Sequence, residues 1–174
     1  MPTAKTHDFI TFALAVPTAL ATYYFTQDWT LTLITTIAML FGGLMFGPDL
    51  DIQRKQYTRW GPLRFIWWPY KVALSHRSRF SHGIVFGTLI RIVYFLIVVS
   101  LLLAIVLFAR EKYLHHAANG VAEVQDAFSY IWEILKPIKR NYLIAAFAGL
   151  WLGASSHTAA DVLGSFFKSV KKSF

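Results

Sequence analysis

Cysteine is absent from this chain of 174 residues, and charged residues are scarce. Without cysteine there is no disulfide and no thiolate for zinc or redox chemistry, so a metal site must use histidine, carboxylate or backbone oxygen. Charged residues make up 15% of the sequence, against about 25% in an ordinary soluble domain. Because a soluble surface needs charge, this shortage points away from a soluble protein.

Apolar sequence is what the chain has in excess, at 56% of its residues. Four apolar stretches are expected to cross a membrane, since a helical span needs roughly 20 mostly apolar residues. Their approximate ranges are 7–25, 31–48, 84–108 and 142–165. The tight connection at Thr26–Thr30 predicts that the first two stretches form an antiparallel hairpin. The sequence therefore predicts an all-α, polytopic membrane bundle of about four spans, in a single domain covering residues 1–174.

The formal net charge of +8 has two interpretations. A basic chain can bind nucleic acid, but in a chain this apolar we favour the positive-inside bias of a membrane protein. We therefore expect membrane lipid as a partner and no nucleic acid. A four-span arrangement places Lys5, Arg54, Lys55, Arg59, Arg64, Lys71, Arg77, Arg79, Lys168, Lys171 and Lys172 on one side, against Arg110, Lys112, Lys136, Lys139 and Arg140 on the other. This bias predicts a multi-pass membrane protein with both termini and the loop 49–83 in the cytoplasm.

Three other segments have a character of their own. Trp60–Leu74 is rich in Trp, Tyr, Pro and basic residues, which predicts an interfacial segment with its aromatic rings at headgroup depth. On the opposite side, apolar residues recur at helical spacing through 119–136, which predicts an amphipathic helix that lies on the membrane or covers the bundle. Ala19-Leu20-Ala21 would suit a cleaved signal peptide, but the apolar run continues to Phe25.

Histidine and aspartate gather in four short segments, each at the cytoplasmic end of a different expected span. The segments are Thr6-His7-Asp8, Gly47–Asp51, His76–Gly83 and Ser156–Asp161. His157 and Asp161 are four residues apart, so a helix places both on one face. Asp49 and Asp51 follow a proline and can point to the same side of an extended or turning backbone. The sidedness depends on Lys and Arg alone, yet it brings all four segments to the same side of the membrane. This agreement is the main argument for one shared site.

A divalent cation is the partner that these groups suggest. Ionisable side chains near a bilayer are costly without partners, and one cation satisfies several of them at once. Imidazole and carboxylate suit zinc, iron or manganese, as one ion or two. Each segment also has a structural alternative. The N-terminal histidine can begin a helix and the paired aspartates can form a turn, His76 and His82 can bind lipid headgroups, and the last His–Asp pair can be a simple hydrogen bond.

The ordered set of motifs resembles that of a bacterial family of uncharacterised metal-binding integral membrane proteins, related to the LexA-regulated, membrane-bound, metal-dependent hydrolases. The resemblance rests on the four segments above and covers nearly the whole chain. It implies a location in a bacterial inner membrane, a divalent metal, and the ligands His7, Asp8, Asp49, Asp51, His76, His82, His157 and Asp161. In the LexA-regulated group the two histidines of the third motif are one residue closer together, so hydrolysis transfers less directly than metal binding.

Hydrolysis is the function that we favour from the sequence. The hypothesis is a metal-dependent hydrolase at the cytoplasmic membrane face, acting on a phosphoester or lipid-like substrate, with Asp49, Asp51 and His82 as catalytic residues. Arg77 and Arg79 would bind the anionic group of the substrate, because the arginine side chain matches phosphate well.

The sequence also allows two alternative functions and two further substrate-binding residues. Arg54 and Lys55 are additional candidates for contacts with the substrate. The chain can also be a non-catalytic metal-binding membrane protein, such as a sensor, a carrier or an assembly factor. The third hypothesis is a structural module in which the His–Asp pairs only lock helices together.

Overall fold

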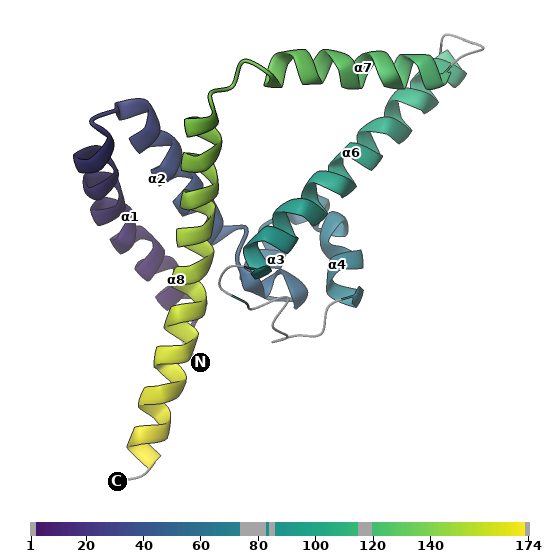
Figure 1. The fold of residues 1–174 in the computed structure, drawn as a ribbon. Coiled ribbons are helices and arrows are strands. Elements are labelled where there is room, and N and C mark those ends of the chain that lie inside the picture. The colour runs from purple at the N-terminus through teal and green to yellow at the C-terminus, as the bar shows by residue number, and fades with distance from the viewer. Residues whose placement is uncertain (1–2, 74–82, 84–85, 115–119, 173–174) are drawn as a thin grey trace. The chain divides into compact units, whose positions relative to one another are not determined.

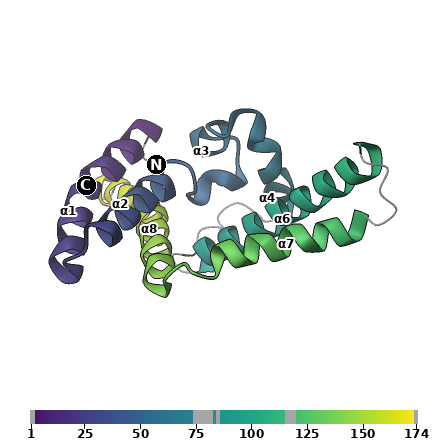
Figure 2. The same cartoon turned by 90° about the horizontal axis from the view of Figure 1, so that it is seen from above.

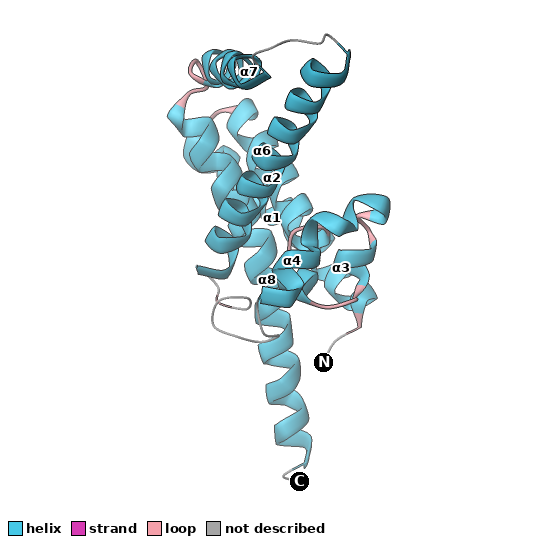
Figure 3. Cartoon of the chain, turned by 90° about the vertical axis from the view of Figure 1, so that its right-hand side faces the viewer, coloured by secondary structure: helices cyan, strands magenta, loops and turns pink. Residues whose placement is uncertain are grey.

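Helices make up all of the regular structure in the part of the chain that is described. The computed structural model describes residues 3–73, 83, 86–114 and 120–172 (Figure 3). Within these ranges, four helical stretches are long and apolar enough to cross a membrane. They are Ala4–Thr26, Trp29–Asp51, Phe86–Arg110 and Arg140–Phe166. The expected all-helical fold, with four helices of that length and character, is confirmed.

The described residues fall into two compact units. The first takes in the chain up to Arg91 and from Asn141 onward, and the second runs from Ile92 to Arg140. The first unit holds α1 (Ala4–Thr26), α2 (Trp29–Leu44), η1 (Pro48–Asp51), α3 (Lys55–Thr58), η2 (Gly61–Trp67), α4 (Trp68–Ala73) and nearly all of α8 (Arg140–Lys172) (Figure 1). The second unit holds most of α6 (Phe86–Leu114) and all of α7 (Gly120–Leu135). The single domain expected from the sequence stays a prediction.

The first two helices form an antiparallel pair, as expected (Figures 1 and 2). Gln27 ends α1 in the left-handed conformation, with φ 50°. Asp28 then caps α2, because its carboxylate accepts hydrogen bonds from the backbone N–H groups of Thr30 and Leu31 at 2.7 and 3.2 Å. A helix stop followed directly by a strong N-cap explains why the connection is so short.

Glycines let α8 approach α2 at backbone distance. A Cβ on Gly153 would lie 2.1 Å from the carbonyl oxygen of Met39, and one on Gly149 would lie 2.3 Å from that of Thr35. The Gly-x-x-x-Gly spacing puts both glycines on one face of α8, a pattern typical of close helix contacts in membranes. His157 is one turn beyond Gly153, so this contact fixes where His157 lies relative to α2.

A small aromatic core holds the segment between α2 and α4. Trp67 and Tyr70 are 0% and 1% exposed. Trp67 packs at a steep angle against Phe46 and Trp60, with 5.3 Å between ring centroids in each pair. Tilted ring contacts thus bury Trp67 and Tyr70 inside the protein, and the headgroup depth expected for the aromatic rings of this segment stays a prediction. Trp68, by contrast, is 61% exposed.

The second unit exposes a long apolar surface. The large apolar side chains of α6 that are more than half exposed within it are Leu96, Ile97, Leu101, Ile105 and Val106. Its other helix, α7, coincides with the amphipathic segment expected at 119–136, and Trp132 is exposed there. An apolar surface of this extent is typical of contact with lipid or with another protein.

Candidate metal centre

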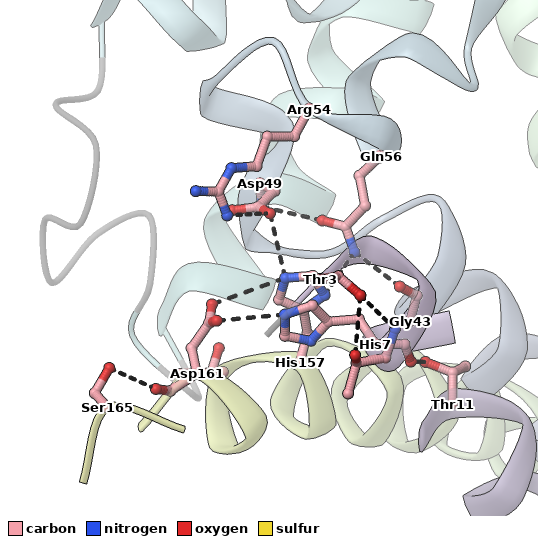
Figure 4. A network of polar contacts seen from close by, with 12 residues as sticks. Thr3, His7, Thr11, Gly43, Asp49, Arg54, Gln56, His157, Asp161 and Ser165 are labelled. Atoms are coloured by element: carbon pink, nitrogen blue, oxygen red, sulfur yellow. Dashed lines mark hydrogen bonds and ion pairs between the residues drawn. The ribbon is translucent and has the colours of Figure 1, made fainter. Parts of the chain in front are cut away.

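Three buried side chains from two helices converge in the first unit. His7 lies in the first turns of α1, and His157 and Asp161 lie one turn apart on α8 (Figure 4). One ligand atom from each residue lies within 4.8 Å of the others. The three residues are between 4% and 7% exposed. The start of α1 and one face of α8 thus bring together groups that are far apart in the sequence.

The contacts within this cluster have ion-pair distances but not hydrogen-bond geometry. His7 Nε2 lies 3.3 Å from Asp161 Oδ1, and His157 Nε2 lies 3.3 Å from Asp49 Oδ2 and 3.9 Å from Asp161 Oδ2. In the described part of the chain, no hydrogen bond satisfies either Nε2 atom or either oxygen of Asp161. Leaving such an atom buried and unpaired costs about 1–3 kcal/mol. One cation would satisfy all of them.

The two imidazole rings lie face to face, with 3.7 Å between their centroids and 8° between their planes. A nitrogen lone pair lies in the plane of its ring. A cation bound by His7 and His157 together therefore requires one ring to rotate out of this stack. The candidate ligand atoms of the three residues are already gathered within 4.8 Å of one another.

The set of ligand atoms fits a divalent transition metal. Two imidazoles and one carboxylate make a combination found in catalytic zinc sites, and imidazole with carboxylate also suits iron and manganese. Structural zinc sites are closed by four protein ligands, whereas catalytic sites keep a position for water or substrate. The three candidate ligands found among the described residues are the number that catalytic sites combine with water or substrate.

Gln56 connects the loop after α2 to α8. Its Oε1 accepts a hydrogen bond from the backbone N–H of Asp49 at 3.0 Å. Its Nε2 donates to the carbonyl oxygen of Gly43 at 2.7 Å and lies 3.2 Å from His157 Nδ1. A Cβ on Gly47 would lie 2.1 Å from Gln56 Nε2, so glycine leaves the room that this amide occupies. Gln56 was not among the expected site residues, since a single amide in the short helix α3 carries no spacing signal in the sequence.

Asp49 stands beside the three-residue cluster. It is 4% exposed in η1, and its Oδ2 accepts a hydrogen bond from Arg54 Nη1 at 3.2 Å. Arg54 and Gln56 extend toward it from one segment, and His157 reaches it from α8 (Figure 4). Its Oδ1 has no hydrogen-bond partner in the described part of the chain. One oxygen of Asp49 is thus held in place, and the other is buried with its hydrogen-bonding capacity unused in the described structure.

Two other expected ligands, Asp8 and Asp51, interact with arginines in the structure. Asp8 pairs with Arg59 at 2.6 Å, and Arg59 also donates to the carbonyl oxygen of Leu44 at 2.8 Å. Asp51 is 3% exposed in η1 and interacts electrostatically with Arg91 of α6. Both carboxylates therefore have arginines nearby, which the sequence could not indicate. The remaining expected site residues, His76, Arg77, Arg79 and His82, lie outside the described residues.

A cavity of about 310 Å³ borders the cluster. Part of its lining comes from the cluster and its neighbour, through His7, His157 and Asp49. Another part comes from the segment around α3, through Arg54, Lys55 and Arg59. The candidate ligands therefore adjoin a space large enough for a small molecule.

Comparisons with known proteins give relatives by sequence. The family described as "Uncharacterized metal-binding protein (DUF2227)" matches residues 2–171. An "Uncharacterized protein" of Aquifex aeolicus (strain VF5) is 31% identical over 133 residues, which are 76% of this chain and 90% of that protein. No solved structure matches the chain significantly.

Proposed function

We propose that this chain, which belongs to the DUF2227 family of uncharacterised metal-binding proteins, is a metal-dependent hydrolase of phosphoesters at the cytoplasmic face of a membrane. The observation that carries the proposal is a cluster of three buried ligands, His7, His157 and Asp161, next to a cavity of about 310 Å³. A metal that only stabilises a fold is usually enclosed by protein ligands, whereas hydrolysis needs room for water and substrate at the metal. The resemblance of the motifs to membrane-bound metal-dependent hydrolases supports the same reaction class.

Each residue of the site has a role in this proposal. When bound, a divalent cation would polarise a phosphoryl oxygen and make water easier to deprotonate. Asp49 lines the cavity beside the cluster, so its carboxylate is the group that would accept a proton from water. Arg54 holds the other oxygen of Asp49, and Gln56 holds its backbone, so the carboxylate is kept at one position.

The membrane location is part of the proposal. It is supported by four helices of sufficient length and apolar character, and by the exposed apolar side chains of α6. The excess of Lys and Arg in the segments beside His7 and Asp49 favours a cytoplasmic position for the site and for both termini. A phosphoester at a membrane face can be soluble or part of a lipid headgroup.

A purely structural role for the His–Asp contacts is the competing function. The distances of 3.3 Å from His7 to Asp161 and from His157 to Asp49 favour it, since these contacts link α1, α8 and η1 without an ion. Under this alternative the protein binds no metal in stoichiometric amount, and its thermal stability does not respond to a chelator.

The test is hydrolysis of p-nitrophenyl phosphate and bis(p-nitrophenyl) phosphate by detergent-solubilised protein loaded with zinc, manganese or iron. Asp49→Asn should lower turnover by roughly 10²–10⁴-fold, the usual contribution of a general base. Asp126→Asn is the matched control, because it removes an exposed carboxylate of α7 in the other unit. Metal-loaded protein that hydrolyses neither ester, or Asp49→Asn protein that is as active as the control, would contradict the proposal.

A further inference from the structure

One short segment supplies the cationic wall of the cavity beside the metal centre. Arg54 and Lys55 stand at the start of α3, and Arg59 follows its last residue. All three line the cavity that the two histidines of the cluster also line. The segment is anchored from within by Gln56, which is 4% exposed and hydrogen-bonded to Gly43 of α2 and to Asp49 of η1. Its basic residues are therefore held at the cavity by a buried contact.

The charges around the cavity leave a positive excess. Three cationic side chains line it together with two carboxylates, Asp8 and Asp49. Each carboxylate is already paired with one arginine, at 2.6 Å from Arg59 and 3.2 Å from Arg54. Lys55 is exposed and forms no ion pair with the described part of the chain. A divalent cation in the cluster would increase the positive excess, so the cavity suits an anion.

The size of the cavity and the shape of its cations narrow the class of anion. About 310 Å³ is at the lower end of the roughly 300–1,000 Å³ that ligand pockets occupy. A polar group of a few heavy atoms fits this space better than a lipid chain. Guanidinium groups bind phosphate oxygens through paired N–H donors, and Arg59 has five such donors, of which Asp8 and Leu44 each take one in the described contacts.

We infer that Arg54, Lys55 and Arg59 bind the phosphate group of the substrate in this cavity, directly beside the metal centre. The choice of phosphate rests on the proposed hydrolase function. The inference assigns to the segment around α3 the anion contacts that the sequence analysis gave first to Arg77 and Arg79. Asp49 lines the same cavity as these three basic residues, so a phosphate bound there would lie beside Asp49.

Binding of inorganic phosphate to detergent-solubilised, zinc-loaded protein tests the inference by isothermal titration calorimetry, without any need for turnover. Lys55→Gln removes an exposed charge and should weaken binding up to about fivefold, as expected for an exposed ion pair. Arg59→Gln removes a charge-assisted hydrogen bond and should weaken it by roughly tenfold or more. Arg64→Gln is the matched control, because Arg64 is an exposed basic residue of η2 that does not line the cavity.

The outcomes separate this inference from the hydrolase proposal. Weaker phosphate binding in Lys55→Gln and Arg59→Gln, with Arg64→Gln like the wild type, supports the site even if no ester is hydrolysed. If the protein hydrolyses esters but all three variants bind phosphate equally well, the phosphate site is overturned and the hydrolase proposal stands. Absence of phosphate binding by zinc-loaded wild-type protein also overturns it.

A competition arm identifies the source of the phosphate group. Glycerol 3-phosphate and phosphatidylcholine vesicles containing phosphatidic acid are each added to the phosphate-bound, zinc-loaded protein. Displacement by glycerol 3-phosphate supports a soluble ester, and displacement by the vesicles alone supports a lipid headgroup. Displacement by neither contradicts a phosphoester site in this cavity.

Discussion

Replacing Gly153 by alanine tests whether the glycine contact between α8 and α2 positions the metal-binding residues. A Cβ at residue 153 would lie 2.1 Å from the carbonyl oxygen of Met39 and 2.5 Å from the backbone nitrogen of Gly43. The first distance is about 1.3 Å short of the 3.4 Å at which ordinary contact begins. Both neighbours are backbone atoms, which no side-chain rotation can remove, so α8 has to move away from α2.

The movement of α8 reaches the site directly. His157 and Asp161 follow Gly153 by one and two turns, whereas His7 belongs to α1 and stays with α2. A displacement of about an ångström exceeds the ~0.2 Å within which metal–ligand distances are held. We therefore expect Gly153→Ala to lower metal affinity by roughly tenfold or more, and to lower the free energy of unfolding by about 1–3 kcal/mol through overpacking.

Two measurements on detergent-solubilised protein check this expectation, namely competition with a metal-binding dye and thermal unfolding with and without zinc. Ala159→Leu is the control, because it enlarges an exposed side chain on the same helix. Gly153→Ala protein with the metal affinity and melting temperature of the wild type would refute the argument that backbone contact at Gly153 sets the site.

Three further perturbations probe the surroundings of the site. Gln56→Ala removes the side chain that contacts Asp49, Gly43 and His157. Metal affinity should therefore fall by roughly 10–100-fold in the same competition assay. Gln53→Ala changes an exposed neighbour and should leave metal affinity unchanged. Asp8→Asn breaks a half-buried ion pair with Arg59 and should cost about 1 kcal/mol or less of stability with full metal content; loss of metal would instead make Asp8 a ligand. Metal at a hundred times its dissociation constant should stabilise the wild type by about 2.7 kcal/mol. A chelator should therefore lower the melting temperature of the wild type but not that of His157→Ala. A chelator that does not change the melting temperature of the wild type would favour the structural role of the His–Asp contacts.

Part of this site could be predicted from residue spacing within a helix and from the distribution of charge along the chain. The interval of four residues between His157 and Asp161 places both on one face of a helix, and the structure has them there. The bias of Lys and Arg put His7 at the same membrane depth as that pair, and the structure brings His7 Nε2 within 3.3 Å of Asp161. The first prediction depends on helix periodicity and the second on the balance of charge along the chain, so neither required knowledge of tertiary contacts.

Contacts between segments far apart in the sequence could not be derived in the same way. Asp8 and Arg59 are 51 positions apart, and nothing in either segment indicates that the arginine reaches the aspartate. The role of Gln56 depends on three partners in different elements. The Gly149-x-x-x-Gly153 spacing was a readable signal for close helix packing, but the identity of the opposing helix comes from the tertiary structure.

Metal content of the purified protein tests the central claim most directly. Elemental analysis of detergent-purified wild type, prepared without chelator and also after reconstitution with zinc, manganese or iron, should give a stoichiometric divalent metal. His7→Ala, His157→Ala and Asp161→Asn should each lose it, while Asp126→Asn keeps it. A wild-type protein that holds no metal under either condition, or three variants that all retain it, would contradict a metal centre formed by His7, His157 and Asp161.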